Sequence, residues 1–390
     1  MRFMARGTPP TWNWQSDDWG AFRHDAAALM PALATARRAQ GEVLGLAKAL
    51  GMEEVRNAKA LIWASESLAT AAIEGEQLNI EGVRSSIAKR LGLPGGKVTR
   101  VRAVEGMLDM MQDATTRWNQ PLSAERLCGW QNALFPAGFS SIHRVVAGTF
   151  RTLAEPMQIV SGPVTRRVVH FEAPPSRRVP REVAKFLKWF NGPSRNMDGL
   201  LRAGIAHLWF ESIHPFEDGN GRVGRALSDL ALAQELQSDS RLVSLATELA
   251  AERDAYYAEL HAASRAGADN TRWLLWFCGR FEAACERSSK LMHAALDKAR
   301  YWARHASAGF DHNQSEVINR LLDAGPRGFE GDLTTVKYVN LTGVSRATAF
   351  RDLAALVAAD ALGTVGAGKA TRYFIQLPGW EPLAATGLGP

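Results

Sequence analysis

The sequence has little cysteine and no long apolar run. Three cysteines occur among 390 residues, Cys128, Cys278 and Cys285. Their odd number and scattered positions fit neither a disulfide framework nor a zinc site. No stretch of about 18 apolar residues is present, so no segment is expected to span a membrane, and the first residues lack the apolar region of a secretory signal. We therefore expect a cytoplasmic protein without a membrane partner.

The composition is that of an ordinary globular protein. Hydrophobic residues make up 46% and charged residues 22%, with a net charge of +6, a balance compatible with nucleotides or nucleic acid that requires neither. A length of 390 residues predicts two or three domains. Long alanine-rich helical patterns predominate. We place the domains at residues 1–110, 111–295 and 311–376.

The strongest functional signal is the segment His214–Arg225, which reads HPFEDGNGRVGR. Gly219 and Gly221 allow left-handed backbone and a close approach of N–H groups to an anion. The apolar run at 223–236 predicts a helix whose N-terminus faces this loop and adds further free donors. The segment therefore predicts a polyphosphate site.

The side chains of this segment predict the chemistry. His214 has the residue type best suited to take a hydroxyl proton near neutral pH. Asp218 is a hard oxygen ligand of the kind Mg²⁺ prefers. Arg222 and Arg225 lie three apart on the expected helix, so both can reach one phosphate chain.

This segment matches the signature of the Fic (Fido) family, His-Pro-Phe-x-(Asp/Glu)-Gly-Asn-Gly-Arg-x-x-Arg, at every fixed position, so the chain resembles that family. The resemblance implies an α-helical enzyme that transfers AMP from ATP to a Ser, Thr or Tyr hydroxyl of a target protein. It implies His214 as general base, Phe216 as loop anchor and Asp218 as Mg²⁺ ligand. The other roles it implies are a backbone anion cradle at Gly219, Asn220 and Gly221, a phosphate contact at Arg222 and a γ-phosphate contact at Arg225.

A second motif lies upstream, where Thr70-Ala71-Ala72-Ile73-Glu74-Gly75 ends a helical pattern. Thr70 and Glu74 are four residues apart and share one helix face. Beside the loop, this segment resembles the inhibitory pattern (Ser/Thr)-x-x-x-Glu-(Gly/Asn) of the Fic family. The resemblance implies that Glu74 pairs with Arg225 and so competes with the γ-phosphate of the nucleotide.

Residues 160–175 predict a short β-hairpin, because Val168, Val169 and Phe171 are followed by paired prolines. The hairpin resembles the Fic flap, which docks a target segment by backbone pairing; a plain connection is the alternative. The expected fold is mainly α: a Fic helical bundle with a β-hairpin flap, followed by a C-terminal winged helix-turn-helix domain.

That C-terminal domain is predicted from three short helices and a two-stranded wing within 311–376. Recognition helices of the winged helix-turn-helix enter the major groove. Seven basic against eight acidic residues from Asp311 to Pro390 give a net charge of −1, which favours a protein contact, including a homodimer, over DNA. The candidates for a DNA or partner contact are Arg346, Arg351, Lys369 and Arg372.

Other functions stay open. The loop contacts phosphates common to all nucleotides, so the donor could be UTP or GTP, and Glu74 could instead position a water molecule for removal of AMP. A nucleotide-sensing, DNA-binding transcriptional regulator is the alternative from another class. The residues do not indicate which target protein would be modified.

Overall fold

The structure is a computed structural model that describes residues 12–93, 102–140, 143–161, 168–239, 242–325, 332–378 and 380. The chain divides into two compact units, residues 1–45 with 56–289 and residues 46–55 with 290–390. The mainly α fold with a small β-hairpin is confirmed, since the described strands form two-stranded hairpins beside many helices. Within these ranges, no helix has the length and apolar character needed to cross a membrane. The domain ranges expected from the sequence stay predictions.

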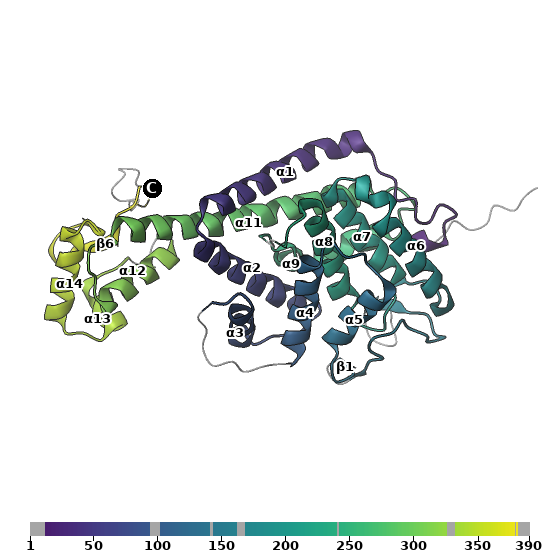
Figure 1. Ribbon diagram of the computed structural model, residues 1–390, viewed down its shortest axis with the longest axis horizontal. Helices are drawn as coiled ribbons and strands as arrows, with labels where there is room; N and C mark the ends of the chain where they lie inside the picture. The colour runs from purple at the N-terminus through teal and green to yellow at the C-terminus, as the bar shows by residue number, and fades with distance from the viewer. Residues whose placement is uncertain are drawn as a thin grey trace, which may run out of the picture. The chain divides into compact units, whose positions relative to one another are not determined.

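Figure 1 shows the elements. In chain order the α-helices are α1 (Ala26–Ala49), α2 (Met52–Ile73), α3 (Ile80–Arg90), α4 (Arg102–Thr116), α5 (Ala124–Leu134), α6 (Val179–Asn191), α7 (Gly199–Ile213), α8 (Asn220–Leu236), α9 (Leu245–Ala251), α10 (Arg253–Ala263), α11 (Thr271–Arg304), α12 (His312–Ala324), α13 (Thr335–Thr342) and α14 (Arg346–Ala358). The strands are β1 (Phe139–Ser140), β2 (His143–Arg144), β3 (Gln158–Ser161), β4 (Val168–Glu172), β5 (Leu362–Val365) and β6 (Arg372–Ile375).

Helix α7 is the centre of the first unit. Every residue from Gly199 to Phe210 is buried, as expected of a helix that is apolar on all sides. Helix α8 packs along it (Figure 1). A Cβ at Gly224 of α8 would lie 2.8 Å from Glu211 and 3.3 Å from the His207 ring, so this glycine lets the two helices approach. The α7–α8 pair therefore holds the loop between its two helices.

Helix α8 begins at Asn220, so the helix expected over the apolar run from Val223 is confirmed and extends three residues further toward the loop. Gly219 precedes the helix in the left-handed region, with φ at 86°. The Asn220 side chain accepts from the Phe216 N–H and donates to the Phe216 carbonyl oxygen, both at 2.9 Å. This reciprocal pair fixes the first helical residue, so Gly221 lies in the first turn of the helix and Gly219 directly precedes it.

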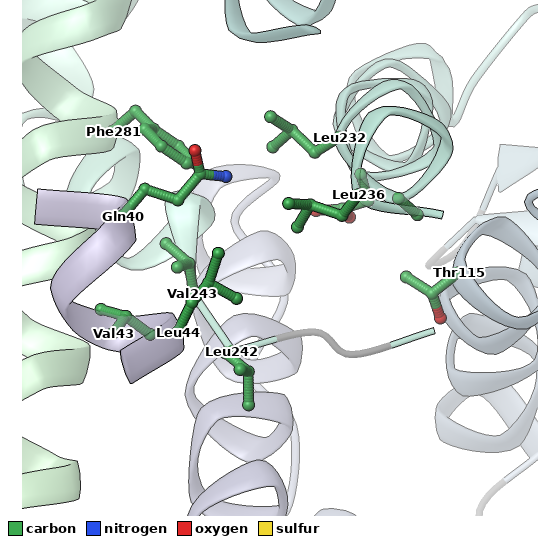
Figure 2. Close-up of a pocket in the computed structure, with 11 residues that line it drawn as sticks. Gln40, Val43, Leu44, Thr115, Leu232, Leu236, Leu242, Val243 and Phe281 are labelled. Atoms are coloured by element: carbon green, nitrogen blue, oxygen red, sulfur yellow. The ribbon is translucent and has the colours of Figure 1, made fainter. Parts of the chain in front are cut away.

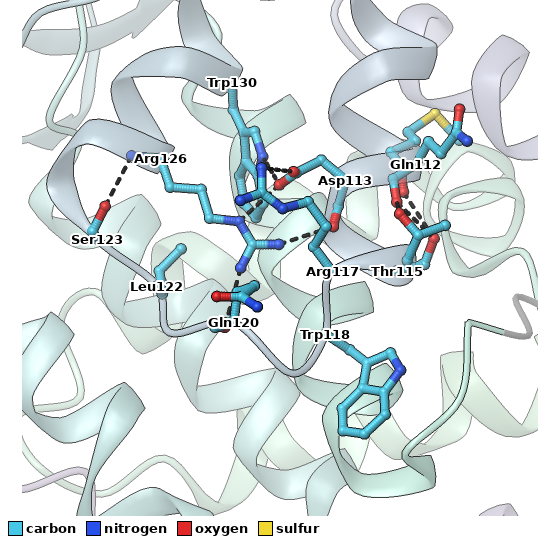
Figure 3. A network of polar contacts seen from close by, with 12 residues as sticks. Gln112, Asp113, Thr115, Arg117, Trp118, Gln120, Leu122, Ser123, Arg126 and Trp130 are labelled. Carbon is cyan, nitrogen blue, oxygen red and sulfur yellow. Dashed lines mark hydrogen bonds and ion pairs between the residues drawn. The ribbon is translucent and has the colours of Figure 1, made fainter.

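Helices α4 and α5 are joined by a polar network around Asp113 (Figure 3). The Asp113 carboxylate accepts from Arg126 Nε and from the Trp130 indole N–H, both at 2.7 Å. The end of α5 lies against the loop, since a Cβ at Gly219 would be 3.0 Å from Phe135 and 3.2 Å from Leu134. The network thus supports the surface on which the loop rests.

Strands β3 and β4 pair antiparallel, with Gln158 opposite Glu172 and Ser161 opposite Val168, so the hairpin expected at 160–175 is confirmed and starts at Gln158. Its turn, 162–167, lies outside the described residues. The Trp14 indole N–H donates to the Glu172 carbonyl oxygen at 2.6 Å. Trp12 packs edge-on to Phe171, with ring centroids 5.4 Å apart. The N-terminal tryptophans thus hold the base of the hairpin.

The second unit contains the C-terminal helices and the β5–β6 hairpin, whose register pairs Leu362 with Ile375. Ser345 caps α14 by accepting from the Thr348 N–H at 3.1 Å. The side chain of Lys369 lies outside the described part of the chain. Of the other contact candidates, Arg372 is half-buried, and the exposed ones are Arg346 and Arg351.

A small apolar cavity of about 50 Å³ lies beside α1, α4, α8 and α11, lined by Val43, Leu232 and Phe281 among others (Figure 2). Its polar lining groups include Gln40 and Thr115. The volume is several times below the roughly 300 Å³ at which ligand pockets begin. None of its lining residues belongs to the 214–225 loop, so the cavity is not a nucleotide site.

Candidate active site

The backbone of His214 ends α7 in the left-handed region, with φ 48° and ψ 60°. A residue with a Cβ pays on the order of 1–3 kcal/mol for such a conformation, so the surroundings must impose it. Arg151 does so, because its Nε donates to the His214 carbonyl oxygen at 2.7 Å and its Nη2 to the Pro174 carbonyl oxygen at 2.5 Å. Arg151 is buried. The sequence assigned Arg151 no function.

The imidazole of His214 is neutral at neutral pH. Burial, and then the charge of Arg151, lower the pKa of His214 to about 4. A neutral imidazole has a free lone pair, so His214 is in the form that a general base requires.

Phe216 anchors the loop in the core. Its side chain is fully buried, with ring centroids 5.4 Å from Phe150 and 6.3 Å from Phe210. Together with the Asn220 side-chain pair, this packing leaves the loop little freedom. Asn220 thus acts on the loop through its side chain, and its backbone is left for the anion cradle.

The start of α8 is suited to an anion. The first N–H groups of a helix have no intrahelical acceptor. Those of Asn220, Gly221 and Arg222 can therefore donate to an anion, which the positive end of the helix dipole also attracts. Asp218 lies beside them, with its side chain 35% exposed and Oδ1 3.4 Å from Arg222 Nη2. No group of three His, Cys, Asp or Glu side chains able to hold a metal occurs in the described residues. A single carboxylate fits Mg²⁺, which takes its other ligands from phosphate and water.

Arg225 is held by the upstream motif. Its Nη2 donates to Glu74 Oε1 at 2.7 Å, and its Nε donates to Thr70 Oγ1 at 2.6 Å. Burial opposes ionisation of Glu74, but the charges of Arg225 and Arg222 outweigh it and lower the pKa of Glu74. A Cβ added at Gly221 would collide with the Glu74 carboxylate. Glu74 is therefore an ionised group that lies against the glycine-rich segment.

Arg222 also has a carboxylate partner, which sequence reasoning missed. Its Nη1 donates to Glu76 Oε1 at 2.8 Å, and its guanidinium lies over the Phe135 ring, 4.9 Å from the centroid. Glu76 lies two residues after Glu74, and that spacing was the feature of the sequence that could have indicated a second carboxylate at the site. Each arginine of the loop thus faces a glutamate from the segment that follows α2.

The structure brings most predicted site residues together. The segment before α8 supplies His214, Phe216, Asp218 and Gly219, and α8 supplies Asn220, Gly221, Arg222 and Arg225. Thr70 belongs to the last turn of α2, and Glu74 follows that helix. The four C-terminal candidates belong to the other unit. Glu211, three residues before His214 and with its side chain 12% exposed, is a further group near the base that the sequence did not single out.

Three family models match separate parts of the chain. The Fic/DOC family model matches residues 121–232, a domain of unknown function named DUF4172 matches residues 12–93, and the C-terminal domain of DIP2311-like transcriptional regulators matches residues 330–376. Protein adenylyltransferase fic-1 of Caenorhabditis briggsae is 31% identical over 199 residues, 50% of this chain and 35% of that protein. A probable protein adenylyltransferase of Aquifex aeolicus is 39% identical over 64 residues, 16% of this chain and 20% of that protein.

The chain thus spans 35% of the length of the first of these relatives. Among solved structures, a Fic family protein from Desulfovibrio desulfuricans shares the fold over 92% of this chain and 97% of its own, with a TM-score of 0.50 and 22% identity. A Fic domain containing signaling protein from Bacteroides thetaiotaomicron does so over 67% of this chain and 96% of its own, with a TM-score of 0.51 and 17% identity. The part of the chain that matches the Fic/DOC family model therefore lies between a part that matches DUF4172 and a part that matches the C-terminal domain of DIP2311-like transcriptional regulators.

Proposed function

We propose that this chain is a protein adenylyltransferase that transfers AMP from ATP to a hydroxyl side chain of a target protein. The observation that carries the proposal is a neutral His214 at the edge of a helix N-terminus that also presents Asp218, Arg222 and Arg225. The likeness of the Fic/DOC domain to proteins described as adenylyltransferases supports the same activity.

The chemistry follows from charge and position. His214 takes the proton of the target hydroxyl, the hydroxyl oxygen forms a bond to the α-phosphorus, and the bond from that phosphorus to pyrophosphate breaks. The backbone amides at the start of α8 and the guanidiniums of Arg222 and Arg225 bind the phosphate oxygens. Asp218 would hold Mg²⁺, which neutralises phosphate charge when bound.

We further propose that Glu74 holds the enzyme in a low-activity state. Its carboxylate occupies Arg225 at 2.7 Å, and its negative charge lies where the γ-phosphate would bind. Two anions cannot share one arginine in a buried site without strong repulsion. Activity would then require that the end of α2 release Arg225.

The test is transfer of label from α-labelled ATP, UTP or GTP to proteins of a cell lysate in the presence of Mg²⁺. We expect Glu74→Gly to raise incorporation from ATP at least tenfold over the unchanged chain. His214→Ala in the Glu74→Gly background should abolish it. Equal incorporation by the unchanged chain and Glu74→Gly would contradict the inhibition, incorporation that survives His214→Ala would contradict the base, and incorporation from UTP or GTP alone would contradict the donor.

A second function is favoured by one observation. Residues 330–376 match the C-terminal domain of DIP2311-like transcriptional regulators, which supports a recognition role for the second unit, with DNA as one ligand. The exposed Arg346 and Arg351 lie on α14, the helix that would enter the major groove. The net charge of −1 over residues 311–390 argues against DNA binding. The alternative role of this C-terminal segment is a contact with another protein.

A further inference from the structure

Helix α7 carries three titratable residues on one face: His207, Glu211 and His214. Their spacing of four and three residues places them along one line of the helix. His207 Nε2 lies 2.7 Å from the Tyr256 hydroxyl, so it is anchored to α10. Burial lowers the pKa of His207 to about 4, and the ring is neutral. His207 is thus a fixed structural group, and Glu211 stands between it and the base.

Glu211 has no structural partner that explains its burial. Its Oε1 has no hydrogen-bond partner among the described residues, and the Nδ1 of His214 has no side-chain partner there. The imidazole also faces the backbone carbonyl of Glu211, a second acceptor that works against the lowering of the His214 pKa by burial. Glu211 Oε2 lies 3.8 Å from His214 Nδ1. An unpaired buried polar atom destabilises the folded chain, and each such exception requires an explanation, of which a functional role is one.

From this geometry we propose that Glu211 is the positioning residue of His214. Its Oε2 accepts a hydrogen bond from Nδ1–H of the imidazole when the site closes on substrate, and Nε2 is then left with a free lone pair toward the target hydroxyl. In other acid–base sites, a hydrogen bond to the ring nitrogen that does not face the substrate fixes the tautomer and the orientation of the catalytic histidine. The proposal rests on the proposed function, since His214 is a base only in that reaction.

The separation of 3.8 Å is longer than a hydrogen bond, and contacts of this kind often tighten only when substrate binds. Burial, followed by repulsion from Glu74, raises the pKa of Glu211 to about 8. At neutral pH Oε2 therefore accepts as part of a neutral carboxyl, and more strongly once Glu211 ionises. The titratable and charged groups that surround Glu211 are Glu74, His207, His214, Arg225, Tyr256 and Tyr257.

The first test reads the tautomer directly and requires no turnover. Histidine is labelled with ¹⁵N in the Glu74→Gly chain and in the same chain with Glu211→Gln or Glu211→Met, and the His214 resonances are followed with α,β-methylene ATP and Mg²⁺. We expect the Nδ1–H tautomer with Glu211 and with Glu211→Gln, which keeps an acceptor, and a shift toward Nε2–H with Glu211→Met. The same tautomer in all three proteins would overturn the proposal.

The second test is label transfer from α-labelled ATP as a function of pH in the Glu74→Gly background. We expect Glu211→Met to lower kcat about 100-fold with the KM for ATP unchanged within twofold, and Glu211→Gln to recover much of the loss. The rate should rise over the pH range in which Glu211 ionises, and this rise should be missing in Glu211→Gln. An unchanged kcat in Glu211→Met would overturn the proposal.

Glu182→Gln is the control for folding, because it removes a fully buried carboxylate from α6. It should leave kcat unchanged. Since Glu211 is neutral below its raised pKa, Glu211→Gln should melt within about 2 °C of its parent at pH 6. If the Glu74→Gly chain transfers no label at all, the proposed function fails while the tautomer measurement still decides the role of Glu211.

Discussion

Two glutamates two residues apart occupy the two arginines of one loop. Glu74 is bound to Arg225 and Glu76 to Arg222, with N···O separations of 2.7 and 2.8 Å. The side chain of Glu76 is 38% exposed and that of Glu74 is 22% exposed. Water and salt therefore screen the Glu76 pair more, and its contribution is the smaller of the two.

This difference predicts a graded effect on nucleotide affinity. In the Glu74→Gly background, Glu76→Gln should tighten binding of α,β-methylene ATP about two- to fivefold, in line with the 0.2–1 kcal/mol typical of a partly exposed pair. Titration calorimetry in the presence of Mg²⁺ measures the affinity for the nucleotide. Glu81→Gln is the control, because Glu81 is 85% exposed and pairs with Arg84 on α3. If the Glu76→Gln and Glu81→Gln variants bind the nucleotide with the same affinity, the role of Glu76 is contradicted.

At the level of elements, the loop depends on helices that contribute nothing to the chemistry. The end of α5 lies under Gly219, and α5 is tied to α4 through Asp113 (Figure 3). Removal of the carboxylate leaves two donors behind it, the Trp130 indole N–H and the largely buried guanidinium of Arg126. Buried donors without an acceptor are costly.

Asp113→Ala should therefore lower the free energy of unfolding by about 2–4 kcal/mol, measured by urea denaturation. The matched control on the same helix is Asp109→Ala, because the Asp109 side chain is 62% exposed and its partner Arg90 also binds Glu105. That variant should lose less than about 1 kcal/mol. Losses of equal size in the two variants would contradict the structural role of the network.

The elements also show what sequence can predict. The loop was predictable because its parts lie within twelve residues, from His214 to Arg225, and because glycine positions constrain the backbone directly. Arg151 was not, since its partner His214 is 63 residues away and the contact is a backbone carbonyl that no pattern marks. Glu76 and Arg222 are 146 residues apart. The first helical residue of α8, Asn220, could not be fixed from the apolar run, because the Asn220 side chain turns back to Phe216 in a local pairing that helix periodicity does not reveal.

On the scale of the whole molecule, charge is unevenly divided along the chain. The total of +6 and the −1 of residues 311–390 leave +7 for residues 1–310. Affinity for DNA backbone follows local positive charge. Residues 311–390 therefore have the weaker electrostatic basis for DNA binding, although residues 330–376 match the C-terminal domain of DIP2311-like transcriptional regulators.

We expect Arg346→Ala with Arg351→Ala to leave the affinity of the full chain for a random DNA duplex within twofold of the unchanged protein, measured by fluorescence anisotropy over a salt series. The control removes two exposed arginines of the first unit, Arg84 and Arg117. A loss of tenfold or more confined to the C-terminal pair would identify α14 as a DNA-reading helix and contradict the expectation.

Glu74 and Arg225 are also synthesised at different times. Glu74 precedes Arg225 by 151 residues, and a ribosome adds about 5–20 residues per second. The carboxylate is therefore synthesised roughly 8–30 s before the arginine that it binds. Glu74 is therefore present in the nascent chain before the loop emerges and folds onto α7. Under the inhibition proposed above, Arg225 would meet its competing carboxylate as soon as it is synthesised.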